Sequence, residues 1–150
     1  MLFTIVKFVH ILLAITAVGF NASYALWTQR ASRSPQHLAF ALSGIKFMDD
    51  RVANPAYGLL LLSGLIMVFV GRIPLTTFWI SAALVLWLVA VAVGLFLYTP
   101  TLRRQIQALE ASGPESAEYR ALDRRGTVVG IAVSLVVLAI LVMMVFKPGG

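Results

Sequence analysis

The chain has 150 residues, of which 60% are hydrophobic and 12% charged, and its mean hydropathy is +0.92. Soluble domains carry about 25% charged residues, so this composition predicts lipid as the main solvent. Cysteine is absent, which excludes disulfides, thiolate catalysis and cysteine-ligated metals. The net charge is +6, but the bases flank apolar segments instead of forming a nucleic-acid module. We therefore expect no nucleic-acid partner.

Four segments are long and apolar enough to cross a bilayer as helices, which takes about 20 residues. They cover residues 2–27, 53–70, 75–98 and 126–146. Lys7 interrupts the first segment, which is also too long for a signal peptide, so we expect it to be a span. Gly71 to Pro74 form a tight turn that makes the middle two spans an antiparallel hairpin. The sequence thus predicts an all-α membrane protein, a four-transmembrane-helix bundle forming one domain over residues 1–150.

The first polar connector, residues 28–52, contains a predicted amphipathic helix. Ser34-Pro35 is typical of a helix start. Apolar residues then recur at helical spacing, at Leu38, Ala41, Leu42, Ile45 and Met48. This helix either lies on the membrane surface or extends the second span beyond a bend at Pro55.

The second polar connector, residues 99–125, is expected to be helical as well. Residues 101–111 should continue the third span, Ser112-Gly113-Pro114 should end it, and residues 114–125 should be helical again. The two connectors hold nine Lys and Arg, whereas only Arg72 and Lys147 lie beyond the other ends of the spans. This asymmetry predicts a bacterial cytoplasmic (inner) membrane protein with cytoplasmic connectors and periplasmic N- and C-termini. We expect the bases to attract anionic lipid headgroups.

Small and polar residues mark the faces that should turn inward, because helices pack in lipid through close contact and polar bonds. The first span carries a single polar face at His10, Ala14, Ala17, Asn21 and Tyr24, spaced by four, three, four and three residues. The other spans offer Gly58, Gly64, Ala83, Ala90, Gly94, Gly126, Gly130 and Ser134. The bulky side chains Phe69, Phe78, Trp79, Trp87 and Phe96 are expected to face outward.

His10 is the one histidine in a predicted span. Ionisable groups at that depth are costly and usually functional, and a neutral imidazole is a common axial ligand of haem iron. Alternatively, His10 bonds a neighbouring helix while Lys7 reaches the interface. A second iron ligand would be a methionine (Met67, Met143 or Met144) or a partner's residue, or the iron would have no second ligand. The candidate cofactor-binding residues are His10, Lys7, Asn21, Tyr24 and Met67, with haem b as the candidate cofactor and its iron as the only metal.

The acidic residues and the search for catalytic motifs give fewer indications of function than His10 does. Asp49, Asp50 and Arg51 are expected to form a small ion-pair network at the membrane surface. No acid lies within a predicted span, which argues against a proton-coupled transporter. The sequence also contains no catalytic triad and no phosphate loop, so an enzyme is disfavoured.

Short motifs nevertheless resemble those of a known family. Lys7-Phe8-Val9-His10-Ile11 resembles the Lys-x-x-His-Ile opening of small haem-containing bacterial protoporphyrinogen oxidases. Met48-Asp49-Asp50-Arg51, followed by Pro55 and Gly64, resembles their Met-x-x-Arg…Pro…Gly second helix, and Phe146-Lys147-Pro148 resembles their closing Lys-Pro. Copper-resistance D-type membrane proteins share this skeleton, as does an uncharacterised family of predicted integral membrane proteins, which the chain resembles most.

The resemblance implies that His10 faces a haem. However, the lysine in the oxidases' third helix has no counterpart in Trp79-Ile80-Ser81-Ala82-Ala83, and their Asn-Glu-x-Pro is replaced by Arg125-Gly126-Thr127-Val128. Three functions follow as hypotheses. The first is an accessory or structural subunit of a larger membrane complex or a homo-oligomer. The second, ranked almost level, is a haem b- or porphyrin-binding protein for electron transfer or sensing. A protoporphyrinogen oxidase-like enzyme ranks well behind.

Overall fold

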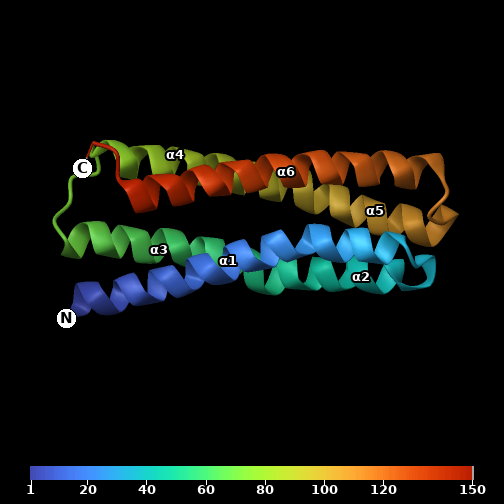
Figure 1. The fold of residues 1–150 in the computed structure, drawn as a ribbon, viewed down its shortest axis with the longest axis horizontal. Coiled ribbons are helices and arrows are strands. Elements are labelled where there is room, and N and C mark those ends of the chain that lie inside the picture. Colours follow the sequence, from blue (N-terminus) through green and yellow to red (C-terminus); the bar gives the residue numbers. More distant parts are fainter. Residues whose placement is uncertain (150) are drawn as a thin grey trace.

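The computed structural model describes residues 1–149, whose regular structure is entirely helical (Figure 1). Four continuous rods, each long and apolar enough to cross a membrane, cover Leu2–Ser32, Pro35–Val70, Phe78–Ser112 and Ala117–Phe146. The predicted class, a four-helix membrane bundle with helical extensions, is therefore confirmed. In chain order the elements are α1 (Leu2–Ser32), α2 (Pro35–Met48), η1 (Asp49–Ala53), α3 (Asn54–Val70), α4 (Phe78–Val93), η2 (Gly94–Tyr98), α5 (Thr99–Ser112) and α6 (Ala117–Phe146).

The second and third rods each contain one short π-helical segment just before a proline. η1 ends two residues before Pro55, and η2 ends two residues before Pro100. Proline inside a helix removes one backbone donor and clashes with the carbonyl four residues earlier, and a wider turn relieves both problems. Accordingly, the amide of Asn54 bonds the carbonyl of Asp49, and the amide of Thr99 bonds that of Gly94, each five residues back.

The amphipathic α2 extends the second span, so the alternative that it lies on the membrane surface is wrong. The chain continues from α2 through η1 into α3 without leaving the helix. The widened turn at η1 stands where we expected a bend at Pro55. Likewise α5 continues the third span, and Gly113, with φ of 78°, ends it in a backbone conformation that favours glycine.

The rods form two pairs. α1 packs along α3, and α4 packs along α6, whereas α2 joins the pairs by contacting both α1 and α5. Both termini lie at one end of the bundle, and the links from α1 to α2 and from α5 to α6 lie at the other (Figure 1). The chain therefore has a terminal end and an extension end.

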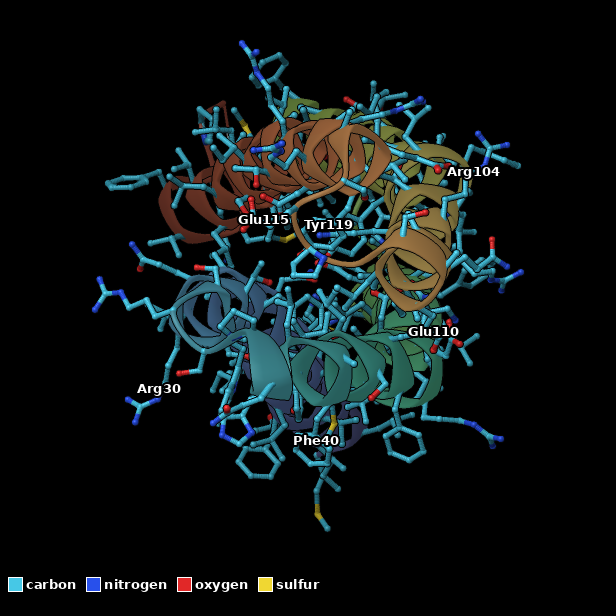
Figure 2. All side chains as sticks on the ribbon, turned by 90° about the vertical axis from the view of Figure 1, so that its right-hand side faces the viewer. Arg30, Phe40, Arg104, Glu110, Glu115 and Tyr119 are labelled. Carbon is cyan, nitrogen blue, oxygen red and sulfur yellow. The ribbon has the colours of Figure 1, made fainter. Side chains whose placement is uncertain are left out.

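The extension end has an apolar core. Its buried residues come from α1, α2, α5 and α6 and are Tyr24, Ala31, Leu38, Leu42, Ile45, Leu102, Ala108, Leu109 and Tyr119. Figure 2 looks onto this end. Tyr119 lies between the helices there, whereas Arg30 and Arg104 point away from the bundle. The polar residues of both connectors thus surround a core like that of a soluble helical protein.

The rest of the bundle, from the extension core to the terminal end, is its apolar half. There the small residues predicted to face inward are mostly found as expected. Ala17, Ala83 and Ala90 are buried, and Phe69, Phe78 and Phe96 are exposed. Trp87 is an exception, because it turns inward and its indole Nε1 donates to the carbonyl oxygen of Tyr57 at 3.2 Å. A buried indole needs such an acceptor, and the neighbouring helix provides it.

Candidate functional site

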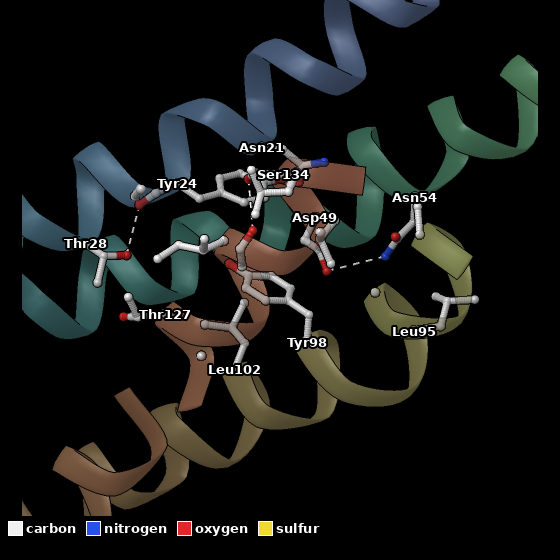
Figure 3. A pocket seen from close by; sticks show the side chains of 18 of the residues that line it. Asn21, Tyr24, Thr28, Asp49, Asn54, Leu95, Tyr98, Leu102, Thr127 and Ser134 are labelled. Carbon is white, nitrogen blue, oxygen red and sulfur yellow. Dashed lines mark hydrogen bonds between the residues drawn. The ribbon is translucent and has the colours of Figure 1, made fainter. Parts of the chain in front are cut away.

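A cavity of about 860 Å³ separates the two pairs of helices. Its walls come from α1, α3, α4, η2, α5 and α6, with Leu42 of α2 and Asp49 of η1 added (Figure 3). Both small-residue faces of the second pair contribute, through Ala90 and Gly94 on one rod and Gly126, Gly130 and Ser134 on the other. The faces that the sequence predicts to turn inward therefore line a cavity in addition to packing against neighbouring helices.

Asp49 is the most buried charged residue of this cavity, with 5% of its surface exposed. Thr99 Oγ1 donates to its Oδ2 at 3.0 Å. Asn54 Nδ2 donates to the same oxygen at 3.4 Å (Figure 3). Both donors directly precede a helix-interrupting proline, Pro55 or Pro100. The two π-helical segments therefore position the carboxylate and its donors together, as π-bulges often do at functional sites.

Tyr24 brings an unused hydroxyl to the same cavity. The residue is 5% exposed, and its Oη is the one buried side-chain nitrogen or oxygen among residues 1–149 without a hydrogen-bond partner. A buried hydroxyl that makes no bond costs free energy of about 1–3 kcal/mol. Native structures rarely keep such a group without a reason. A bound ligand or an ordered water would satisfy it.

The cavity walls carry negative charge only. Asp49 and Asp123 line them, whereas no lysine, arginine or histidine does. Asp123 accepts a bond from Gln105 Nε2 at 2.9 Å. Between residues 1 and 149 the ion pairs are Lys46 with Asp50 and Arg120 with Glu115, so neither cavity acid has a counter-ion. The expected ion-pair network of Asp49, Asp50 and Arg51 is therefore wrong. Asp50 pairs with Lys46 on the surface, whereas Asp49 is buried and lines the cavity.

Two glycines of the cavity have no packing role. A Cβ placed on Gly58 or Gly94 would meet no atom within 4 Å. Gly64 behaves differently, because a Cβ there would lie 3.3 Å from His10 Cε1. Close packing explains Gly64 but not Gly58 or Gly94, whose missing side chains leave space in the cavity.

Of the predicted cofactor-binding residues, Asn21 and Tyr24 line the cavity, whereas His10, Lys7 and Met67 do not. The amide of Asn21 bonds the hydroxyl of Tyr57. His10 lies between α1 and α3, where its Nδ1 is 2.8 Å from Ser63 Oγ. Lys7 is exposed, and Met67 lies one turn beyond Ser63 on α3.

Whether the cavity fits a haem depends on His10 and on the residues that line the walls. When Ser63 Oγ donates to the carbonyl of Leu59, 2.7 Å away, it can accept from His10 Nδ1–H, and this tautomer leaves the Nε2 lone pair for a metal. A ligand histidine is commonly oriented in this way. The cavity walls, however, contain no histidine, methionine or cysteine. The cavity therefore does not fit a haem held by His10, and such a haem would have to bind elsewhere.

Sequence reasoning missed Asp49, although a signal was present. The buried residues Leu38, Leu42, Ile45, Asp49, Ala53 and Ala56 are spaced by four, three, four, four and three residues. That stripe continues the amphipathic face of α2 into the span and places Asp49 on it. Asp50, the next residue, is rotated by about 100° away from this stripe and is exposed. The two adjacent acids therefore look alike in the sequence but differ in burial.

Four apolar rods, inward small residues and a cavity with a few polar groups between two helix pairs define a small polytopic helical membrane protein. Residues 4–148 match the family model described as predicted integral membrane protein (DUF2269), and the chain belongs to that family. No curated protein and no solved structure matches the chain. Kinship with the protoporphyrinogen oxidases or the copper-resistance proteins therefore stays a prediction. Within residues 1–149, no group of three or more histidines or acids is placed to hold a metal ion.

Proposed function

We propose that this protein binds an amphipathic small molecule in the cavity between its two helix pairs. The observation that supports this most directly is the cavity itself, whose volume of about 860 Å³ lies within the usual range of ligand pockets, roughly 300–1,000 Å³. Its walls are mostly apolar, with a few polar groups including Asp49, Tyr24 and Gln105. Binding pockets for amphipathic ligands have this composition.

The proposed route of entry is from the bilayer, between α1 and α6. Leu26 on α1 and Leu135 on α6 both line the cavity, although 68% and 62% of their surfaces are exposed. Residues of that kind mark a rim where the cavity meets the lipid-facing surface. A ligand dissolved in the membrane would therefore reach the polar groups without crossing water.

Mass spectrometry of the intact protein, released from mild detergent, tests the proposal. Wild-type protein purified from its native membrane should retain a small molecule. Gly94→Leu should lose most of it, because the new side chain enters open space in the cavity. Gly19→Leu is the matched control, since a Cβ at Gly19 also meets no atom but Gly19 does not line the cavity. Equal occupancy in the two folded variants would contradict the proposal.

An accessory role in a larger membrane complex, or in a homo-oligomer, is a second proposal. Exposed aromatic side chains such as Phe69 and Phe96 support it, since a partner helix would cover them as readily as lipid does. It predicts that other subunits, or further copies of this chain, co-purify in a mild detergent. A strictly monomeric particle would contradict it.

Haem b binding through His10 is a third proposal, supported by the contact of its Nδ1 with Ser63 Oγ, since a ligand histidine commonly bonds a neighbour through its other ring nitrogen. Protein purified with haem should then show a Soret band that His10→Ala removes. A colourless, folded preparation would contradict this. An oxidase-like enzyme would need that haem as well, and failure to rescue a strain lacking protoporphyrinogen oxidase would count against it.

The expected location is a bacterial inner membrane with periplasmic termini, which places the extension end on the cytoplasmic side. The positive charge of the two connectors supports this orientation. A tag on the C-terminus should be accessible to protease only from the periplasm. Cleavage only from the cytoplasm would reverse the orientation.

A further inference from the structure

We propose that the cavity selects amphipathic cations, meaning molecules with an ammonium group on an apolar body, and that Asp49 binds the cation. This inference rests on the proposed function and names the chemical class of its ligand. The charge of the walls, the free hydrogen-bonding groups and the aromatic side chains support it separately.

The charge argument begins with what Asp49 lacks. It is buried and has no ion-pair partner among residues 1–149, because Lys46 pairs with Asp50 instead. Burying a carboxylate without a counter-ion is costly. The other charged wall residue, Asp123, is also an acid. A cationic ligand would supply the missing positive charge, whereas an anionic ligand would meet two like charges with no base to offset them.

The hydrogen-bonding argument concerns the atoms that remain free. Thr99 and Asn54 both donate to Oδ2 of Asp49, which leaves Oδ1 for a ligand. Tyr24 lines the same cavity, and its buried hydroxyl has no partner. An ammonium group has three donors and no acceptor. It can therefore bond an oxygen of Asp49 and the Tyr24 hydroxyl together, which satisfies the buried group that the protein leaves unpaired.

The aromatic side chains of the walls also suit a cation. Trp87, Tyr57 and Tyr98 line the cavity beside Tyr24. Ring faces attract cations, and Trp does so most strongly. Leu95, Leu102 and Leu138 complete an apolar wall for the rest of the ligand. An alcohol of the same shape would keep these apolar contacts but would lose the charge-assisted bond to Asp49.

The test uses three probes with one fluorescent body: pyrenemethylamine as the cation, pyrenemethanol as the neutral analogue and pyrenecarboxylate as the anion. The protein is placed in phosphatidylcholine nanodiscs, whose lipid has no net charge, and empty nanodiscs correct for partitioning. Trp27→Phe and Trp79→Phe leave Trp87 as the only tryptophan, since the chain has three. Quenching of Trp87 by pyrene then reports occupancy of the cavity.

The expected order of affinity is amine, then alcohol, then carboxylate. Asp49→Asn should weaken amine binding about tenfold and leave alcohol binding unchanged, because only the charged bond is lost. Asp50→Asn is the matched control. It removes the neighbouring acid, whose side chain is 40% exposed and pairs with Lys46 outside the cavity. It should leave the affinities of all three probes unchanged.

Tyr24→Phe separates a binding role from a structural one. It should weaken amine binding about fivefold, yet it should not lower the unfolding temperature of the ligand-free protein, because the deleted hydroxyl has no partner. A structural tyrosine would show the reverse pattern. Unchanged amine binding in Tyr24→Phe would remove Tyr24 from the proposed site.

The outcomes distinguish the inference from the proposed function. If amine and alcohol bind equally in the wild type while Gly94→Leu abolishes both, the cavity binds ligands but the preference for cations is refuted. The same conclusion follows if Asp50→Asn weakens amine binding as much as Asp49→Asn, because the effect would then be one of surface charge. If no probe quenches Trp87, the cavity is not the ligand site that we propose.

Discussion

At the extension end, the four rods bury large side chains such as Leu38, Leu42 and Ile45. In the apolar half, the buried side chains are mostly small, as at Ala17, Ala56 and Ala83. The difference follows the solvent. Around the charged extension, water drives apolar side chains together. In lipid that drive is absent, so helices depend on close contact between small residues and on polar bonds between helices.

This comparison explains where the cavity lies. The extension core closes the bundle at one end by joining α2 to α5. In the apolar half each helix pair packs well internally, through α1 with α3 and α4 with α6. No hydrophobic force draws these two pairs together in lipid. Space therefore remains between them, and the polar residues beside the extension core line it.

The largest expected effect is at the extension core. Leu42 is 1% exposed there, so Leu42→Ala should lower the free energy of unfolding by about 2–5 kcal/mol. Leu88→Ala is the control, because Leu88 is 61% exposed on the lipid-facing side of α4, and it should change the value by less than about 0.5 kcal/mol. Unfolding in mixed micelles measures both. Similar losses would show that the two regions do not differ as described.

An intermediate effect is expected where the small residues pack. Ala17 on α1 is fully buried, and Ala17→Leu should destabilise the protein by about 1–3 kcal/mol through overpacking. Ala22→Leu places the same side chain on an exposed position of α1 and should be nearly neutral. The same unfolding assay applies. Tolerance of leucine at position 17 would contradict the proposed dependence on close contact.

The smallest effect is expected for the polar bond between α1 and α3. Ser63→Ala removes the partner of His10 and should cost about 0.6 kcal/mol, the average for such bonds between membrane helices. Ser81→Ala is the control, because Ser81 Oγ makes no bond to another helix. It donates to the carbonyl oxygens of Thr77 and Phe78 at the start of its own helix, at 3.4 and 3.1 Å. Equal effects of the two substitutions would show that the bond between helices adds nothing.

Much of the architecture is predictable from the sequence because it depends on local pattern. The length of the apolar segments predicts the spans. Helical spacing predicts the inward face of α1, which includes the buried residues Ala17 and Tyr24. The amphipathic pattern from Leu38 to Ile45 also marks the face that forms the extension core.

The cavity is not predictable in this way, because it depends on how the helix pairs meet. Gly58 and Gly94 look like packing positions in the sequence, and only the three-dimensional arrangement shows open space beside them. Asp49 looks like part of an exposed pair until the face of α2 is followed through η1. The bulk of Trp87 predicts an outward side chain, because the sequence does not reveal the carbonyl of Tyr57 that accepts its indole bond.

The most direct test of the central claim, an open cavity with polar groups between the helix pairs, uses the absence of native cysteine. Ser134→Cys places a thiol on the cavity wall, and Ala132→Cys places one two residues away on an exposed surface of α6 outside the cavity. Thiol reagents react with the thiolate, which needs a polar surrounding. In nanodiscs, a small cationic methanethiosulfonate should label the cysteine at 134 faster than that at 132, by on the order of tenfold. Equal rates would contradict the account.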